Sequence, residues 1–455
     1  MKVGDSFMHP LWGHGVVLSV ELRRQGAFAK VRFGIYATES IPVEDIPGGH
    51  SLSPAVSSVP PANRASNATR RLGLQPLNLS TARAGVQALK LGQVLESQVE
   101  RISVGTDLHE AAFSGAFKKA EGGKPQLIII EGAWGVGKTH LLTLLSAYAA
   151  KRDFAISTTI LDGCAASLSQ PMRLLESITS SIRFPGQKTP MGVGTMLANV
   201  KRRGMPELRG LAGPRMVKFM DQVPLDALEN PEAIAVLEDY LGLSLAATTA
   251  KQELDSLGFR HVALPPLRAQ SVEQRGDRLR ELLCDWAAFC VAGKAKGFLV
   301  VLDEVDVDYA RAGGWGLEQR ARHNATLAAL GAIGKTGVPL VVAFGSAPAG
   351  PGADASIDAV QDVIKQLGKV DVHERATTLD VSQLRSLGKR VFALYSDAYP
   401  GFESKLSDRQ LQSITSMLLK EYKKQLSPVP RRFVRSLLHC FDLVDLGQAA
   451  VTDFG

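Results

Sequence analysis

The stretch that decides the fold is Gly132-Ala133-Trp134-Gly135-Val136-Gly137-Lys138-Thr139. It fits the pattern G-x-x-x-x-G-K-[ST] of a phosphate-binding loop, or P-loop. The apolar run 127–130 precedes it, and residues 140–148 place apolar side chains at helical spacing behind it. A strand, a glycine-rich turn and a helix in this order allow backbone N–H groups to surround a polyphosphate at the positive end of the helix. The stretch therefore predicts a site for a nucleoside triphosphate.

Side chains at the end of this stretch supply further contacts. Lys138 can place its charge near the β- and γ-phosphates, and the Thr139 hydroxyl can bind Mg²⁺. His140 follows in the first turn of the helix and is expected to contact the nucleotide. The predicted cofactors are ATP and Mg²⁺. The predicted nucleotide-binding residues are Gly132, Ala133, Trp134, Gly135, Val136, Gly137, Lys138, Thr139 and His140.

A second apolar run, 298–302, ends in Asp303-Glu304. Such runs are typical of strands buried on both faces of a parallel sheet. An Asp at the end of this strand can hold Mg²⁺, and the Glu after it can orient the attacking water. The alternative is that Asp303 and Glu304 only cap the end of the strand. The intact P-loop makes this alternative the weaker one. The pair predicts hydrolysis as well as binding, with Asp303 as a metal ligand and Lys138 and Glu304 as catalytic residues.

Three single residues extend the site by their resemblance to positions in AAA+ ATPases. Ser346 follows the apolar run 339–344, where those proteins place a sensor residue beside the γ-phosphate. Arg375 falls where an AAA+ ring places an arginine that acts on a neighbour's γ-phosphate, and a surface arginine is the alternative. Arg431 follows Pro430 at the start of a late helix, where the sensor arginine of the lid lies. If Arg375 acts in trans, the active species is a homo-oligomer.

The pattern along the chain predicts an α/β fold. Residues 79–380 are expected to form an AAA+ P-loop ATPase core with a doubly wound parallel sheet and a helical insert at about 171–290. Residues 381–455 are expected to form a helical lid over the nucleotide. Residues 1–47 show short β runs and predict a small all-β module. Residues 48–78 are rich in Gly, Pro and Ser and predict a flexible linker.

The segments 9–15 and 31–33 resemble the SH3-like barrels of UvrD-type helicases and CarD-type transcription factors. In those proteins the barrel contacts RNA polymerase or DNA. The resemblance therefore implies an SH3-like barrel over residues 1–47 and RNA polymerase as a possible partner.

Residues 80–445 resemble the BrxD-like ATP-binding proteins of BREX phage-defence systems. Segment 131–142 is similar to their P-loop, and segment 430–442 to their P-R-x-F-V-R-x-L-x-x-x-L-D pattern. Segments 82–92 and 103–110 are similar to their helical lead-in and V-G-R-x-x-E box, with Thr106 where Arg is frequent. Lys138 and Asp303 lie 165 positions apart, and the family carries a long helical insert there. The resemblance implies an AAA+ ATPase that works in antiviral defence with DNA and other defence proteins, such as a helicase.

Composition limits the classes of function. Nowhere do 18 apolar residues run together, and no apolar segment marks the N-terminus, so we expect neither a membrane span nor a secretory signal. The four cysteines are dispersed and form no C-x-x-C pair, which predicts reduced thiols, a cytoplasmic protein and no zinc site.

The net charge of +7 comes in part from two basic clusters. One contains Lys201, Arg202, Arg203, Arg209, Arg215 and Lys218, and the other Lys420, Lys423, Lys424, Arg431, Arg432 and Arg435. Such clusters can follow a phosphate backbone, whereas the low aromatic content of 6% argues against base stacking. We expect duplex DNA binding without sequence specificity, with a solvated or protein-docking face as the alternative.

Two other functions stay open at this point. One is a nucleotide-gated switch of the STAND type that hydrolyses rarely and signals through a protein partner. The other is an adaptor for RNA polymerase in which the ATPase is secondary. The favoured function is a Mg²⁺-dependent AAA+ ATPase that couples hydrolysis to DNA remodelling or helicase loading.

Overall fold

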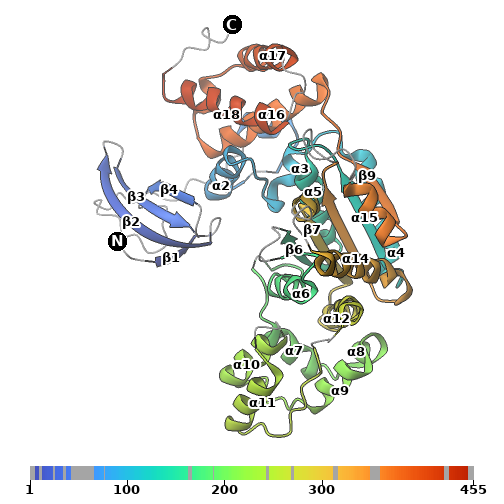
Figure 1. Cartoon of the computed structure of the whole chain (residues 1–455). Coiled ribbons are helices and arrows are strands. Elements are labelled where there is room, and N and C mark those ends of the chain that lie inside the picture. The colour runs from blue at the N-terminus through green and yellow to red at the C-terminus, as the bar shows by residue number, and fades with distance from the viewer. Residues whose placement is uncertain are drawn as a thin grey trace.

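The computed structural model contains two sheets and many helices (Figure 1). It describes residues 66–75, 77–161, 166–187, 189–241, 245–267, 271–310, 316–348, 359–424 and 430–448, and the backbone of four N-terminal strands. The rest of the predicted N-terminal module, and residues 48–65 of the predicted linker, lie outside the described residues.

The four N-terminal strands form an antiparallel sheet in the order β1-β2-β3-β4. Their bounds are Ser6–His9, Gly13–Arg23, Gly26–Phe33 and Ala37–Pro42. Each strand pairs with the next one along the chain, and among these strands β1 and β4 do not pair with each other. The pairing therefore confirms a β module but does not show the SH3-like barrel that the sequence predicts.

The central sheet has five parallel strands in the order β6-β7-β8-β5-β9. The strands are β5 (Gln126–Glu131), β6 (Phe154–Ile160), β7 (Gly297–Asp303), β8 (Leu340–Ser346) and β9 (Val372–Arg375). Every residue of β5, β7 and β8 is buried, as their apolar runs predict. The sheet confirms the α/β fold and is compatible with a P-loop nucleotide-binding core.

Helices cover both faces of this sheet (Figure 1). Helices α4 (Asp107–Glu121) and α5 (Lys138–Lys151) bury Ile128 and Ile130 of β5 on one face. Helices α6 (Pro171–Ser180), α12 (Val272–Ala292), α14 (Leu317–Gly331) and α15 (Ala359–Leu367) bury Leu127 and Ile129 on the other. This alternation follows from the two-residue period of a strand.

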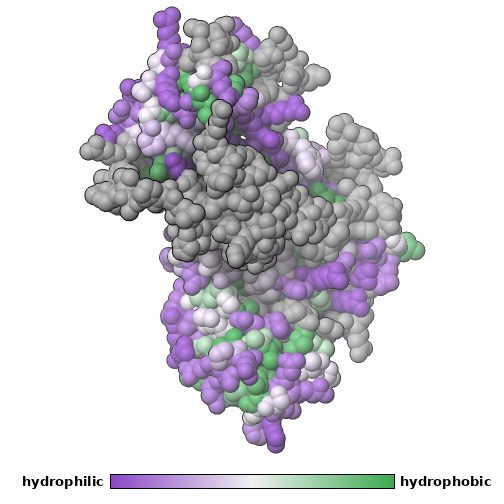
Figure 2. Space-filling model, turned by 90° about the vertical axis from the view of Figure 1, so that its left-hand side faces the viewer, coloured by the Kyte–Doolittle hydropathy of each residue, from purple (hydrophilic) through white to green (hydrophobic). Residues whose placement is uncertain are grey.

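The described residues between β6 and β7, where the sequence predicts a helical insert, contain several helices. Beyond α6 the insert contains α7 (Val193–Arg202), α8 (Pro206–Leu211), α9 (Pro214–Gln222), α10 (Pro231–Leu241) and α11 (Ala247–Ser256), and it returns through α12. Helix α12 packs on α6, α8, α14 and β7, which attaches the insert to the sheet. Figure 2 shows apolar residues among hydrophilic ones on the lower part of the molecule, where Figure 1 places the insert.

The C-terminal helices form a second core together with residues from the start of the described chain. They are α16 (Val381–Ala398), the short η5 (Phe402–Ser404), α17 (Asp408–Lys424) and α18 (Pro430–Asp445). Helices α1 (Asn67–Arg71) and α2 (Leu79–Lys90) bury Ala68, Ala82 and Val86 in the same apolar cluster. This second core is therefore assembled from both ends of the described chain, and we keep the word lid for the helices α16 to α18, which lie where the sequence predicts one.

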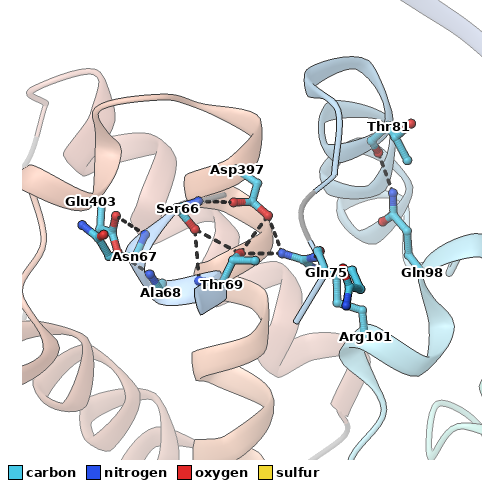
Figure 3. Close-up of polar contacts among 10 residues, drawn as sticks. All are labelled: Ser66, Asn67, Ala68, Thr69, Gln75, Thr81, Gln98, Arg101, Asp397 and Glu403. Atoms are coloured by element: carbon cyan, nitrogen blue, oxygen red, sulfur yellow. Dashed lines mark hydrogen bonds and ion pairs between the residues drawn. The ribbon is translucent and has the colours of Figure 1, made fainter. Parts of the chain in front are cut away.

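Helix α1 lies inside the stretch for which the composition predicts a flexible linker. Ser66 caps it by accepting the Thr69 N–H, and Glu403 accepts the N–H groups of Asn67 and Ala68. Asp397 accepts the Ser66 N–H and the Thr69 hydroxyl (Figure 3). Residues 67–71 form a helix because α16 and η5 supply hydrogen-bond partners that a free linker would lack.

Candidate nucleotide-binding site

The P-loop connects the buried strand β5 to helix α5. Gly135 and Gly137 take φ values of +80° and +121°, which glycine adopts without steric cost. Among the residues that the structure describes, no side chain caps the first turn of α5. Its N–H groups are therefore available to an anion, and the helix dipole favours negative charge at this end.

Lys138 lies in the first turn of α5 with its ammonium group directed back over the loop. Its Nζ donates to the Gly132 carbonyl oxygen at 2.9 Å and lies 6.0 Å from the centre of the exposed Trp134 ring. Burial lowers the pKa of Lys138, while the charges of Asp306, Asp303 and Glu304 oppose that shift. These acidic neighbours favour the charged ammonium form that phosphate binding requires.

Thr139 and Asp303 meet where the sheet ends. The Thr139 hydroxyl donates to Asp303 Oδ2 at 2.8 Å, and the Glu304 N–H donates to Asp303 Oδ1 at 2.8 Å. Burial raises the pKa of Asp303, and these hydrogen bonds oppose the rise. Gly345 leaves room for this carboxylate, because an added Cβ would lie 2.4 Å from Asp303 Oδ1.

The oxygen atoms of Thr139 and Asp303 suit Mg²⁺. This ion takes one or two protein oxygen ligands together with waters and phosphate oxygens. Among the described residues no three His, Cys, Asp or Glu side chains gather as a complete metal site. With one hydroxyl and one carboxylate oxygen, the Thr139–Asp303 pair fits a metal ion whose other ligands are water and phosphate oxygens.

Glu304 departs from ordinary backbone geometry. Its φ of +61° lies in the left-handed region, which residues other than glycine rarely adopt and which costs about 1–3 kcal/mol. Burial, together with the charges of Asp303 and Asp306, raises the pKa of its carboxyl group. A strained backbone and a raised carboxyl pKa at one residue are typical of functional sites.

A cavity of about 540 Å³ contains these groups and extends to the lid. One wall comes from the core and includes residues 134–141, Asp303, Glu304 and Asp306. The other wall comes from segments 89–109, 376–387 and 430–434. The volume is in the range of small-ligand sites, which are about 300–1,000 Å³. The cavity thus has a charged end on the core and an apolar end, with Leu89, Ile102 and Leu387, toward the lid.

The structure brings Arg431 and His140 to this cavity. Arg431 extends across Gly92, where an added Cβ would lie 2.8 Å from Arg431 Nε. His140 Nε2 pairs with the Ser103 hydroxyl at 2.7 Å, and burial lowers its pKa to about 4. His140 is therefore neutral at pH 7, and it ties the P-loop helix to the segment before α4.

Ser346 and Arg375 lie at the same end of the sheet but are not among the residues that line the cavity. Ser346 is buried at the end of β8, and its carbonyl oxygen accepts the Gly132 N–H at 3.2 Å. Arg375 is 72% exposed, and its Nε donates to Glu131 Oε1 at 2.5 Å in the same chain. The structure thus places Ser346 next to the P-loop and Arg375 on the exposed edge strand.

Sequence reasoning missed several residues around the site. Glu131, the last residue of β5, holds both Arg375 and His373, the latter at 2.8 Å. Asp306 was not missed: it continues the acidic run after Glu304, and the sequence predicts a solvated residue or one behind the metal ligands there. In the structure Asp306 accepts the Ala347 N–H at 2.8 Å. A carboxylate that directly precedes Gly132 was the available signal for Glu131, but its partners come from β9, a strand too short and too exposed for a pattern to predict.

Known proteins resemble parts of this chain. A family model described as "BREX system ATP-binding protein BrxC/D" matches residues 79–178. A chain of the solved E. coli MS115-1 HORMA:CdnC:Trip13 complex is 13% identical over 76% of this chain and 91% of that chain. The TM-score of this comparison is 0.35. No curated protein sequence matches this chain.

Within the described residues, no helix combines the length and the apolar character that a bilayer crossing requires.

The family match spans the lead-in helix α2, the P-loop and α6. Over these residues the chain is similar to the ATP-binding proteins of BREX systems.

Proposed function

We propose that this protein is a Mg²⁺-dependent ATPase of the AAA+ class that acts in bacterial phage defence. One observation carries the proposal: Lys138, the Thr139–Asp303 pair and Glu304 lie together at one end of a cavity of nucleotide size. The match of residues 79–178 to BREX ATP-binding proteins supports the defence role.

The residues of the site have separate roles in binding and hydrolysis. The first-turn N–H groups of α5 and the Lys138 ammonium bind the phosphates, and Thr139 and Asp303 would hold Mg²⁺. When bound, Mg²⁺ supplies charge neutralisation on the phosphate oxygens. Glu304 orients a water molecule and accepts its proton.

The test is turnover of Mg²⁺-ATP by the full chain. We expect Glu304→Gln to lower kcat by about 10²–10⁴-fold while the Kd for ATP stays within about threefold, because only the proton acceptor is lost. Lys138→Ala should weaken ATP binding itself. Glu318→Gln, an exposed position on α14 that pairs with Arg322, is the matched control and should leave both quantities unchanged. An unchanged kcat in Glu304→Gln would refute the hydrolytic assignment.

The proposal includes binding of duplex DNA through the insert. Arg202 pairs with Glu229 and Arg209 with Asp221, so part of the basic cluster is neutralised within the chain. Arg215 and Lys218 lie exposed, three residues apart on α9, and form no ion pair with the described residues. These two cations are the strongest support for a phosphate contact.

Fluorescence anisotropy with duplex DNA at several salt concentrations tests this contact. Arg215→Gln/Lys218→Gln should weaken binding uniformly across sequences and reduce the salt dependence, because two phosphate contacts are lost. Arg209→Gln, which removes a cation already paired with Asp221, is the control. Equal effects of the two variants would contradict the contact on α9.

Arg375 is proposed to act on the nucleotide of a neighbouring copy, supported by its exposure on the edge strand. Arg375→Ala and Lys138→Ala should each be inactive alone. If the arginine acts in trans, mixing the two variants should restore part of the activity, since one copy supplies the arginine and the other the intact P-loop. No recovery on mixing would contradict a shared site.

A further inference from the structure

The acidic run does not end at Glu304. Asp306 and Asp308 follow on the short helix α13 (Val305–Ala310), and the two carboxylates have different surroundings. Asp308 is fully buried and accepts the Ser167 hydroxyl at 2.7 Å and the Leu168 N–H at 2.8 Å. Asp308 therefore fixes the chain after β6 and does not line the cavity.

Asp306 lines the cavity and reaches a different strand. Its Oδ1 accepts the Ala347 N–H at 2.8 Å. Ala347 directly follows Ser346, whose carbonyl oxygen accepts the N–H of Gly132, the first residue of the P-loop. One carboxylate thus connects the segment that carries Glu304 to the end of β8, and through it to the P-loop.

This connection matters because β8 lies between β5 and β7 in the sheet. The Ser346 hydroxyl is buried, and its hydrogen bond to the Ala347 carbonyl oxygen is long at 3.4 Å. That bond is weak, so the position of the Ser346 hydroxyl depends on where the backbone of 346–347 is held. Within the described residues, the Asp306 carboxylate is the side chain that holds the Ala347 N–H.

We propose that Asp306 is a positioning residue for ATP hydrolysis, which fixes the Ser346–Ala347 backbone relative to Glu304 and the P-loop. The inference rests on the proposed function only for its effect on turnover. The hydrogen bond requires an acceptor and no charge, so an asparagine can replace the aspartate. Misplacement by a fraction of an ångström to about 1 Å costs up to about 10²-fold in rate when reacting groups must be aligned.

The test compares Asp306→Ala, Asp306→Asn and the matched variant Asp308→Asn in the full chain. Asp306→Ala should lower kcat by about tenfold or more and change the Kd for ATP by less than about threefold, because the tie aligns groups rather than binding substrate. Asp306→Asn should restore most of kcat. Asp308→Asn removes a negative charge from the same helix at a position outside the cavity and should retain kcat.

Hydrogen exchange at the Ala347 amide gives a second readout that does not depend on hydrolysis. The amide should be protected in the wild type and in Asp306→Asn, and should exchange faster in Asp306→Ala. Equal kcat in the wild type and Asp306→Ala, or a failure of Asp306→Asn to restore kcat, overturns the catalytic part of the inference. An equal exchange rate of the Ala347 amide in the wild type and in Asp306→Ala overturns the proposed hydrogen-bond link itself. A wild type without ATPase activity would refute the proposed function, and the exchange measurement would still decide the tie.

Discussion

The two walls of the cavity are built in different ways. The core wall comes from one continuous loop and the ends of parallel strands, where the register sets Ile160 beside Asp303 and Glu131 beside Ser346. The lid wall comes from three segments that are far apart in the sequence, and buried polar contacts hold those segments together. Local sequence therefore determines the core wall, whereas the lid wall depends on tertiary contacts.

Two polar contacts join helices α2 and α3 (Val99–Ile102) to the lid helices α18 and α16. Lys90 of α2 pairs with Asp442 of α18 at 2.8 Å, and the Tyr395 hydroxyl donates to the same carboxylate. Arg101 of the short helix α3 pairs with Asp397 of α16 in a site where the two side chains are 8% and 2% exposed (Figure 3). Helix α3 touches both cores, since Val99 packs with the sheet helices and Ile102 with the lid. Substitutions at these two contacts should therefore change the Kd for ATP although the substituted residues do not line the cavity.

The largest expected effect is at the buried pair. Arg101→Met leaves the Asp397 carboxylate buried without its cation, which costs about 3–5 kcal/mol. Arg101 also donates to the Thr69 hydroxyl at 2.6 Å, so the anchor of α1 is weakened with it. We expect the free energy of unfolding of the lid to fall by that amount in urea titrations followed by circular dichroism. The Kd for ATP should rise as the lid wall loosens.

Two further variants sharpen this prediction. Arg101→Met/Asp397→Leu removes both charges and should recover part of the loss, because no unpaired carboxylate is left buried. Arg71→Met breaks an ion pair with Asp408 in which the two side chains are 67% and 66% exposed. This variant should lower the free energy of unfolding by at most about 1 kcal/mol. Equal losses for Arg101→Met and Arg71→Met would contradict the view that a buried polar contact, rather than an exposed one, holds the segments of the lid wall together.

A buried carboxylate in the insert gives the next largest effect and lies outside both walls. Asp285 Oδ1 accepts the Gly213 N–H at 2.6 Å, and burial raises the pKa of Asp285 from 3.8 to about 6. A raised pKa means that the folded state binds more protons than the unfolded state between about pH 4 and 6. The contribution of Asp285 to the free energy of unfolding should therefore fall as the pH rises through this window, by up to about 3 kcal/mol, and stay level above it.

Asp285→Asn keeps an acceptor for the Gly213 N–H and should flatten this dependence, as measured by urea unfolding at several pH values. Asp221→Asn, at a half-exposed position that pairs with Arg209, is the control and should keep the slope. The Kd for ATP should stay unchanged in Asp285→Asn, because the insert residue does not line the cavity. A changed ATP affinity in Asp285→Asn would show that the insert is coupled to the walls of the nucleotide cavity.

The same contrast explains what the sequence could predict. The P-loop and Asp303-Glu304 are readable because fixed spacing beside apolar runs is a local signal. Arg101 and Asp397 are 296 positions apart, and neither stands in a motif that would connect them. Strand β9 was missed because its four residues, Val372 to Arg375, alternate half-buried and exposed positions and contain a single apolar residue. Their strand conformation comes from pairing with β5, which no local pattern shows.

The smallest expected effect lies where the lid wall meets the phosphate end. Arg431 is exposed in part, so its contact with a phosphate should contribute only about 1–2 kcal/mol, or roughly tenfold in the Kd for ATP. Arg431→Ala should therefore weaken ATP binding about tenfold in calorimetric titrations, whereas Arg435→Ala, one turn later on α18 and outside the cavity, should not. Gly92→Ala should reproduce part of the effect, because its Cβ would displace the Arg431 side chain. If Arg431→Ala left the ATP affinity unchanged, the lid wall would bind the nucleotide without its arginine, whereas the core wall binds through Lys138, and the two walls would differ in chemistry as well as in origin.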